Sequence, residues 1–249
     1  MSNQSLSQNK RIVAIDQSNY IPWKGYFDMI NMVDEFILYD DMQYTRRDWR
    51  NRNKIKTPQG LSWLTIPVQV KGKFFQKIKE TIISDSGWAA KHWKTIVINY
   101  AGAPYFNAYK EIFEELYLGC TSRKLSEINY RFLFKICRLL GIKTKLTWSS
   151  DYNIIEGKTE RLVDLCQQAK ATEYLSGPSA KNYIDPKLFK QTGIKLTYMD
   201  YSGYPEYPQL YPPFEHGVSI LDLILQTGTD APKYMKSFGH ETYDKKNKT

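Results

Sequence analysis

Two carboxylates, Asp40 and Asp41, stand side by side directly after the short apolar run 36–39. Hard cations such as Mg²⁺ prefer carboxylate oxygens, so this pair has the chemistry to hold a metal beside a phosphate group or to handle protons. Paired acids at the end of a strand also occur without any metal. We therefore treat Asp40 and Asp41 as candidate catalytic and metal-binding residues, with a purely structural pair as the alternative.

His92 is the histidine with a catalytic interpretation, because its ordinary pKa near neutrality suits a general base. It stands alone in the sequence, as do His216 and His240, and the alternative is a buried histidine with satisfied hydrogen bonds. The chain contains neither H-E-x-x-H nor G-x-S-x-G, and it lacks G-x-x-x-x-G-K-[ST] and G-x-G-x-x-G. The sequence therefore gives no support for a zinc-protease site, for the nucleophile elbow of α/β-hydrolases, or for either of the two common glycine-rich phosphate-binding loops.

A strand, helix and second strand are predicted around these residues. The apolar run 12–15 has the length of a buried parallel strand, a helical periodicity begins near Pro22, and 36–39 is a second apolar run. Asp16, Gln17 and Asn19 stand at the end of the first strand. Ligands of open α/β sheets bind beyond the carboxyl ends of the strands, so we expect these polar side chains to face a substrate.

Residues 45–56 form a strongly basic segment after the second strand. The segment holds Arg46, Arg47, Arg50, Arg52, Lys54 and Lys56 against a single acid, Asp48. Arginine matches phosphate and carboxylate groups with two parallel hydrogen bonds. We interpret the segment as a loop that binds such an anion, and a solvated loop is the alternative.

The turn 176–182, with the sequence SGPSAKN, follows another short predicted strand. It is rich in small residues and carries Lys181, a composition typical of anion-binding loops at sheet edges. A plain turn with a solvated lysine is the alternative.

The remaining patterns alternate between strand and helix and predict a wound sheet. We expect strands at 60–70, 78–83, 145–148, 173–175 and 195–199; helices at 88–100, around 109–117, from a Ser122 cap to Gly141, at 159–169 and at 219–225; and irregular structure over 201–214. Pro67 should place the strand 60–70 at an edge or make it irregular. The predicted class is α/β, with a wound, mostly parallel sheet of nucleotidyltransferase-like (Rossmannoid) type and flanking helices.

Composition predicts one globular domain. A chain of 249 residues with 42% hydrophobic residues can bury a sizeable core, so we expect a single α/β domain over 11–235 with an inserted helical region near 87–141. The polar segment 1–10 is predicted to be disordered and 236–249 to be a flexible basic tail. Three cysteines without metal-type spacing, no membrane span and no signal peptide favour a cytoplasmic setting.

Four long blocks of the sequence resemble the WbqC-like proteins of bacterial surface-polysaccharide gene clusters. The blocks are QSNYIPWKGYFDMI, YDDMQYTRRDWRNRNKIKTPQGLSWLTIPV, EYLSGPSAKNYID and YPQLYPPFEHGVSILDLI, and the likeness runs from about Arg11 to Gly228. At Asp16-Gln17-Ser18 the chain departs from the family, in which His or Met followed by Gln and Pro is expected. The resemblance implies work on O-antigen or related glycan precursors.

A second resemblance concerns mechanism. The order of a P-x-x-G turn, D-D-M-Q-Y and L-S-G-P-S-A-K-N-Y-I is similar to that in pantoate/β-alanine ligase and the wider nucleotidyltransferase superfamily. That likeness implies ATP as a cofactor, and Mg²⁺ would accompany it if Asp40 and Asp41 bind a metal. It would put Tyr20, Pro22 and Gly25 at the phosphate-side turn, Gln43 near a carboxylate substrate, and Ser176, Ser179 and Lys181 on the leaving pyrophosphate.

These observations define the candidate residues and three functional hypotheses. The candidate catalytic residues are Asp40, Asp41 and His92, and the candidate substrate- or nucleotide-binding residues are Gln17, Asn19, Tyr20, Pro22, Gly25, Tyr26, Gln43, Tyr44, Arg46, Arg47, Arg52, Asn53, Lys54, Ser176, Gly177, Ser179 and Lys181. The favoured function is an enzyme that forms an amide on a nucleotide-linked amino sugar, by acyl or aminoacyl transfer or by ATP-dependent ligation. A glycosyltransferase or other sugar-nucleotide enzyme is the second hypothesis.

The third hypothesis is a non-enzymatic module that binds an anionic glycan or nucleic acid. Basic residues interleaved with Trp49, Trp63 and Tyr44 permit stacking together with phosphate contact. Nucleic acid is nevertheless disfavoured, because the net charge of +9 is concentrated in one segment and in the C-terminal tail. The expected partner is therefore a sugar nucleotide or amino sugar.

Overall fold

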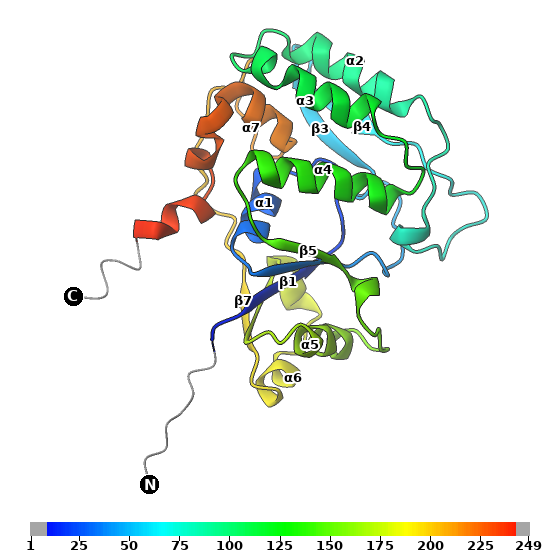
Figure 1. Ribbon diagram of the computed structural model, residues 1–249, viewed down its shortest axis with the longest axis vertical. Helices are drawn as coiled ribbons and strands as arrows, with labels where there is room; N and C mark the ends of the chain where they lie inside the picture. The colour runs from blue at the N-terminus through cyan, green and yellow to red at the C-terminus, as the bar shows by residue number, and fades with distance from the viewer. Residues whose placement is uncertain (1–8, 243–249) are drawn as a thin grey trace.

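The computed structural model describes residues 9–242 and the side chains of residues 9–239. Its centre is a five-stranded parallel sheet in the order β5-β2-β1-β6-β7. The strands are β1 (Ile12–Asp16), β2 (Glu35–Leu38), β5 (Lys145–Trp148), β6 (Glu173–Ser176) and β7 (Lys195–Tyr198). Because the chain winds outward from β1 first in one direction and then in the other, the sheet is doubly wound. The predicted α/β class with a Rossmannoid parallel sheet is confirmed (Figure 1).

Continuous apolar runs form the central strands because helices cover the sheet on both faces. In β1, Val13 and Ala14 are fully buried, and Ala14 pairs in register with Phe36 of β2. Alternate residues of β1 enter different cores: Ala14 joins the larger one, whereas Val13 and Ile15 join the smaller one. The polar residues that follow both strands are thereby held at the carboxyl edge of the sheet.

Helices form a layer on each side of the sheet (Figure 1). Helices α5 (Thr159–Gln168) and α6 (Pro186–Gln191) pack on one face. Helices α1 (Lys24–Asn31), α4 (Leu125–Leu139) and α7 (Ile220–Thr227) contribute to the core on the other face. No helix in the described part of the chain is long and apolar enough to cross a membrane.

A large insertion lies between the neighbouring strands β2 and β5. It contains the antiparallel hairpin β3 (Arg52–Thr57) and β4 (Gly60–Thr65), the short helix η1 (Ile78–Glu80), and helices α2 (Trp88–Tyr100), α3 (Phe106–Leu118) and α4. In Figure 1, α2 and α3 lie on the far side of α4 from the sheet. The insertion therefore adds a further layer over the face of the sheet opposite α5 and α6.

The structure corrects several expected boundaries in the insertion. The basic segment is not a loop throughout, because 52–57 is strand β3, which buries Asn53 and Ile55 in alternation with the less buried Arg52. The expected strand 60–70 ends at Thr65. Only the isolated bridge between Val68 and Ile83 joins it to 78–83, which begins as η1.

Capping and tail residues also differ from expectation. Lys124, not Ser122, occupies the N-cap position of α4, and the Ser122 hydroxyl instead accepts a hydrogen bond from the Lys124 amide. The basic tail expected from 236 begins with residues held by the domain, since the amides of Lys236 and Ser237 donate to the buried Asp28 carboxylate. Residues 1–8 and 243–249 lie outside the described residues.

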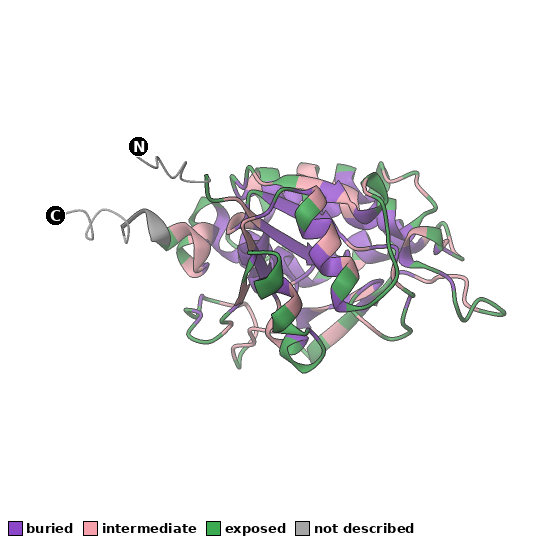
Figure 2. Cartoon of the chain, turned by 90° about the horizontal axis from the view of Figure 1, so that it is seen from below, coloured by how far each residue is buried: buried purple, intermediate pink, exposed green. Residues whose placement is uncertain are grey.

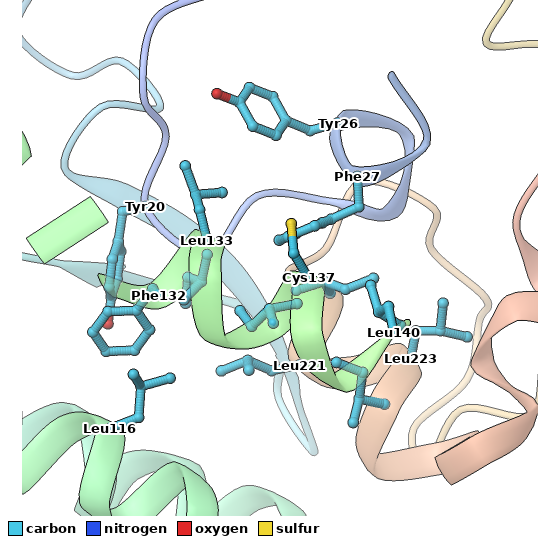
Figure 3. Packing of buried hydrophobic residues seen from close by; sticks show 14 of the residues in the cluster. Tyr20, Tyr26, Phe27, Leu116, Phe132, Leu133, Cys137, Leu140, Leu221 and Leu223 are labelled. Atoms are coloured by element: carbon cyan, nitrogen blue, oxygen red, sulfur yellow. The ribbon is translucent and has the colours of Figure 1, made fainter. Parts of the chain in front are cut away.

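The larger core is centred on α4 (Figure 3). Phe132 is fully buried and makes edge-to-face contacts with Tyr20 and Tyr117, at ring-centroid distances of 5.5 and 4.8 Å. Leu133, on the next position of the helix, is also fully buried. Figure 2 shows that buried residues concentrate in the strands and in the helix faces turned toward them.

We predict that Phe132→Ala lowers the free energy of unfolding by about 3–5 kcal/mol, because it removes a ring from a closed aromatic cluster. Urea denaturation measures this change. Phe134→Ala is the matched control, since Phe134 lies on the same helix and is 47% exposed; its cost should stay below about 1 kcal/mol. Equal losses in the two variants would contradict the placement of α4.

Candidate functional site

A cleft of about 710 Å³ opens at the carboxyl edge of the sheet, beside the ends of β1 and β6. These two strands flank the point where the winding direction reverses, which is where doubly wound sheets bind ligands. The cleft is lined by Ile15, Asp16, Gln17, Tyr39, Met42, Arg50, Gly157, Lys158, Arg161, Leu162, Tyr174 and Tyr183. Three cations and one carboxylate therefore line the cleft together with mostly aromatic and aliphatic residues.

Arg50 reaches the cleft from the segment before β3. Its guanidinium donates to the Asn19 side-chain oxygen at 2.6 Å and to the Gln17 carbonyl at 3.3 Å, and it lies 3.7 Å from the Asp48 carboxylate. Its buried Nε finds no hydrogen-bond partner among the described residues. The contacts with Asn19, Gln17 and Asp48 thus fix the guanidinium in position.

Asp16 supplies the negative charge of the cleft. Its carboxylate accepts one hydrogen bond, at 2.8 Å, from the amide of the following residue, Gln17. Burial raises the pKa of Asp16, and the nearby Arg50 charge opposes that rise only in part. A carboxylate with a raised pKa is suited to accept a proton from a substrate.

Lys158 and Arg161 stand at the start of α5, on the opposite wall. Lys158 is the N-cap residue, and the Arg161 side chain donates to the Ile155 carbonyl at 2.6 Å. The arginine also lies within 3.5 Å of the Tyr39 hydroxyl. The amino end of a helix favours anions, so the backbone of α5 and these two side chains act in the same sense.

A second cavity of about 310 Å³ is lined by Asn19, Pro22, Trp23, Trp49, Asn53, His216 and Gly217. The turn 17–22 contributes residues to this cavity and to the cleft. Within the turn, Ile21 has a φ of 39°, a strained value for a β-branched residue. The Asn53 amide holds it by donating to the carbonyls of Tyr20 and Ile21 at 3.3 and 2.9 Å. Strain of this kind persists only where surrounding contacts maintain it.

The structure brings a minority of the predicted residues to these two openings. Gln17 lines the cleft, and Asn19, Pro22 and Asn53 line the second cavity. Tyr20 and Tyr26 are buried beneath the turn, where the Tyr26 hydroxyl donates to the Gln17 carbonyl at 2.8 Å. Both tyrosines thus support the turn from below.

The residues present at Asp40 and Asp41 do not fit a Mg²⁺ site. The Asp40 carboxylate is buried and accepts from the Ser18 amide at 2.9 Å and from the Ser126 hydroxyl. Asp41 pairs with Lys79 at 2.5 Å, and hydrogen bonds from Lys79 and Ser149 keep its pKa low against the opposing effect of burial. No group of three or more potential metal ligands occurs among residues 9–239.

His92 lies inside the large core. Its Nε2 donates to the Thr65 carbonyl at 3.1 Å, and its Nδ1 hydrogen bonds with the Tyr20 hydroxyl at 2.9 Å. Burial lowers the pKa of His92 to about 4. Both ring nitrogens are engaged by the protein, so the geometry favours the structural interpretation of this histidine.

The basic residues after β2 extend over the surface of the hairpin instead of lining the cleft. Arg46 donates to the Val70 carbonyl at 3.0 Å, and Arg52 donates to the Arg47 carbonyl at 2.5 Å. The Arg52 guanidinium stacks 4.0 Å from the Trp63 ring, and the Lys54 amine lies 5.3 Å from the same ring.

Gln43 and Tyr44 connect β2 to the loop before η1. The Gln43 side chain donates to the Phe74 carbonyl at 2.8 Å, and the amide of the buried Tyr44 donates to the Gln76 carbonyl at 2.9 Å. Met42, one residue earlier, lines the cleft. Gln43 and Tyr44 therefore hold a neighbouring loop and do not enter the cleft.

A comparison with known protein families covers all the residues that line the two openings except Ile15 and Asp16. The model of the WbqC-like protein family matches residues 17–234. The chain belongs to the WbqC-like protein family. It is 55% identical over 224 residues to the uncharacterized protein Rv1507c of Mycobacterium tuberculosis (strain ATCC 25618 / H37Rv), covering 90% of this chain and 97% of that protein. No solved structure matches the chain significantly.

In this WbqC-like protein, the turn 176–182 borders the cleft without lining it. Ser176 is buried and its hydroxyl lies 3.3 Å from that of Tyr174, whereas Ser179 is exposed. Lys181 places its amine 5.1 Å from the Tyr198 ring. The segment after Gly177 forms the 3₁₀ helix η3 (Pro178–Asn182), and the wall of the cleft is made by Tyr174 and Tyr183 on either side.

Gly25 has a packing role in this WbqC-like protein. A side chain at this position would overlap the Trp23 ring, because a Cβ would lie 2.3 Å from it. The glycine lets the indole fold back over the first turn of α1, next to the second cavity that Trp23 lines.

Four charged residues that line the cleft of this WbqC-like protein were not singled out as candidate site residues: Asp16, Arg50, Lys158 and Arg161. Asp16 was expected only as one of the polar residues at the strand end, and Arg50 only as part of the basic segment. Asp16 occupies the strand-end position that the fold rule singles out. Arg50 was hidden among other basic residues, and only the tertiary fold selects it. Lys158 and Arg161 stand at the start of α5, which connects β5 to β6, the neighbour of the central strand β1. Their place at the start of this crossover helix is the sequence signal that could have identified them.

We predict that Asp16→Asn raises the stability of the protein at neutral pH. A carboxyl group whose pKa is raised in the folded state contributes stability that is present below its unfolded pKa and is lost as pH rises through the folded pKa. The gain in melting temperature should therefore shrink toward the wild-type value as pH falls to about 4.

Asp200→Asn is the control for this prediction. Asp200 is exposed, and hydrogen bonds from Ser202 lower its pKa, so its replacement should bring no gain at neutral pH. An Asp16→Asn protein less stable than wild type at pH 7 would contradict the electrostatic assignment.

Proposed function

We propose that this protein is an enzyme of bacterial surface-polysaccharide biosynthesis that forms an amide on a nucleotide-linked amino sugar. Family membership suggests a polysaccharide-related role. The observation that carries the proposal is the cleft at the winding reversal, in which Arg50, Lys158 and Arg161 accompany Asp16. Cations for a diphosphate and a carboxylate for an amine are the two requirements of such a substrate.

The three cations are assigned to phosphate oxygens. Arg50 is preorganised by its hydrogen bonds to Asn19 and Gln17, and Arg161 is held against the carbonyl before α5. Fixed donors of this kind bind phosphate without losing side-chain freedom at the moment of binding. The same residues would hold ATP phosphates if the acyl group is activated by ATP.

Asp16 is assigned as the general base. A neutral amine attacks an activated acyl carbon through its lone pair, and Asp16 would take the proton that the nitrogen loses as the new C–N bond forms and the leaving group departs with its electron pair. The pKa of Asp16, raised by burial, brings the carboxylate closer to the working pH. A positioned base of this kind contributes about 10²–10⁴-fold to the rate.

The cytoplasm is the proposed location. All three cysteines are free thiols, and Cys137 and Cys166 are buried without a disulfide partner, as expected in a reducing compartment.

The proposal predicts that Arg161→Ala weakens binding of a dTDP- or UDP-linked amino sugar by about tenfold or more, because a charge-assisted hydrogen bond contributes about 1.5–3 kcal/mol. Thermal-shift titration measures the affinity, since ligand at 100 times its dissociation constant stabilises the fold by about 2.7 kcal/mol. Arg138→Ala, on the exposed face of α4, is the control.

The same titration separates the cleft from the basic segment after β2. Arg52→Ala should leave sugar-nucleotide affinity unchanged if the cleft is the site. It should abolish that affinity if the basic segment 45–56 binds the phosphates of the substrate. Parallel titrations with ATP and with coenzyme A thioesters identify the source of the acyl group. Mass-spectrometric detection of the amide, and its loss in Asp16→Asn, test the chemistry itself.

A further inference from the structure

Two phenylalanines at the tip of the loop 70–77 are the most exposed large apolar side chains among the described residues. Phe74 is 71% exposed and Phe75 is 82% exposed. Their rings contact each other edge to face, with centroids 5.0 Å apart and an interplanar angle of 89°. Two adjacent aromatic side chains held in water are costly to maintain, and they indicate a surface that is covered in use.

The loop is also cationic. Lys71, Lys73 and Lys77 are exposed on either side of the phenylalanines, and the segment 71–77 contains no acidic residue. The Lys77 amine lies 3.5 Å from the Asp41 carboxylate, which leaves Lys71 and Lys73 as the lysines of this loop without an ion pair among the described residues. The exposed Arg46 is attached to the base of the loop by its hydrogen bond to the Val70 carbonyl. Aromatic tips and basic flanks therefore occupy the same part of the surface.

Hydrogen bonds to backbone carbonyls, from two side chains and one amide, fix the loop in this position. The Gln76 side chain donates across the loop to the Gln69 carbonyl at 2.8 Å, and Gln43 donates to the Phe74 carbonyl at 2.8 Å. The Lys73 amide donates to the Val70 carbonyl at 3.2 Å. The loop is built as a turn, so the exposure of its two rings follows from a defined backbone.

We propose that this loop docks the protein on an anionic membrane surface, with Phe74 and Phe75 inserted at the level of the lipid headgroups and acyl chains. Aromatic side chains next to lysines match such an interface, since the rings enter its apolar zone while the ammonium groups meet lipid phosphates. A nucleic acid fits less well, because perpendicular rings provide no parallel platform for successive bases. A second copy of this chain fits less well because like-charged loops would face each other.

Docking would also place the cleft near the bilayer. Gln43 and Tyr44 hold the loop, and Met42, directly before them, lines the cleft. Substrates presented at a membrane surface would thus reach the cleft without crossing the width of the molecule. This inference is independent of the proposed function, because it rests on the loop alone.

Co-sedimentation with vesicles tests the proposal on the full-length protein. The wild type should bind vesicles of phosphatidylcholine and phosphatidylglycerol in equal parts and should bind pure phosphatidylcholine at least about tenfold more weakly. The double variant Phe74→Ser/Phe75→Ser should lose at least about tenfold in affinity for the anionic vesicles. The double variant Lys71→Gln/Lys73→Gln should lose a similar amount, at about fivefold per lysine.

Ile98→Ser is the matched control, because Ile98 is 67% exposed on α2, outside this loop. It should bind as the wild type does, and all variants should keep the wild-type melting temperature. The proposal would be overturned if the wild type did not sediment with the anionic vesicles, or if the phenylalanine variant bound them as well as the wild type does. It would also be overturned if that variant lost oligonucleotide binding or self-association instead of vesicle binding. Sugar-nucleotide affinity in the absence of vesicles should remain unchanged, which keeps this test separate from that of the proposed function.

Discussion

The hydrogen bonds of Arg50 to the turn after β1 are the constraint on which both openings of this protein depend. A strained turn at Ile21 separates the cleft from the second cavity, and Arg50 and Asn53 hold that turn from the side of the insertion. The central strand supplies the first residues of the turn, and the insertion supplies the groups that fix its shape. Neither part of the fold forms the site alone.

Buried polar groups extend this connection into α4. Asn129 donates to the Arg50 carbonyl at 2.9 Å and to the Ser18 hydroxyl at 3.0 Å, while Ser126 on the same helix donates to Asp40. Each of these groups would be costly to bury without its partner. Asp40 and His92 are therefore best understood as members of the scaffold that holds the turn.

The fold was largely predictable because its signals are local. The apolar run of β1, the helical periodicity of α2 and the apolar run of β5 each specify one element without reference to distant residues. The hairpin strand β3 was missed because charged residues dominate its composition, although burial alternates along it.

The site was less predictable because it is a tertiary product. Gln17 was found from its place after a buried strand, which is a local signal. Arg50 was not distinguishable from Arg46 or Arg52, since the property that separates them is the partner each finds in space. The Arg161 guanidinium approaches the hydroxyl of Tyr39, which follows β2 and is 122 residues away in the sequence.

The pairing of β1 has a consequence for how the chain folds as it is synthesised. One edge of β1 pairs with β2, which follows it after the single helix α1, and the other edge pairs with β6. Next to β1 and β6, the Arg11 amide donates to the hydroxyl of Thr172, which is 161 residues away. Until the ribosome has released β6, the central strand keeps an open apolar edge, which is the kind of edge that aggregates. The helical insertion is synthesised during that interval, because it lies between β2 and β5 in the chain.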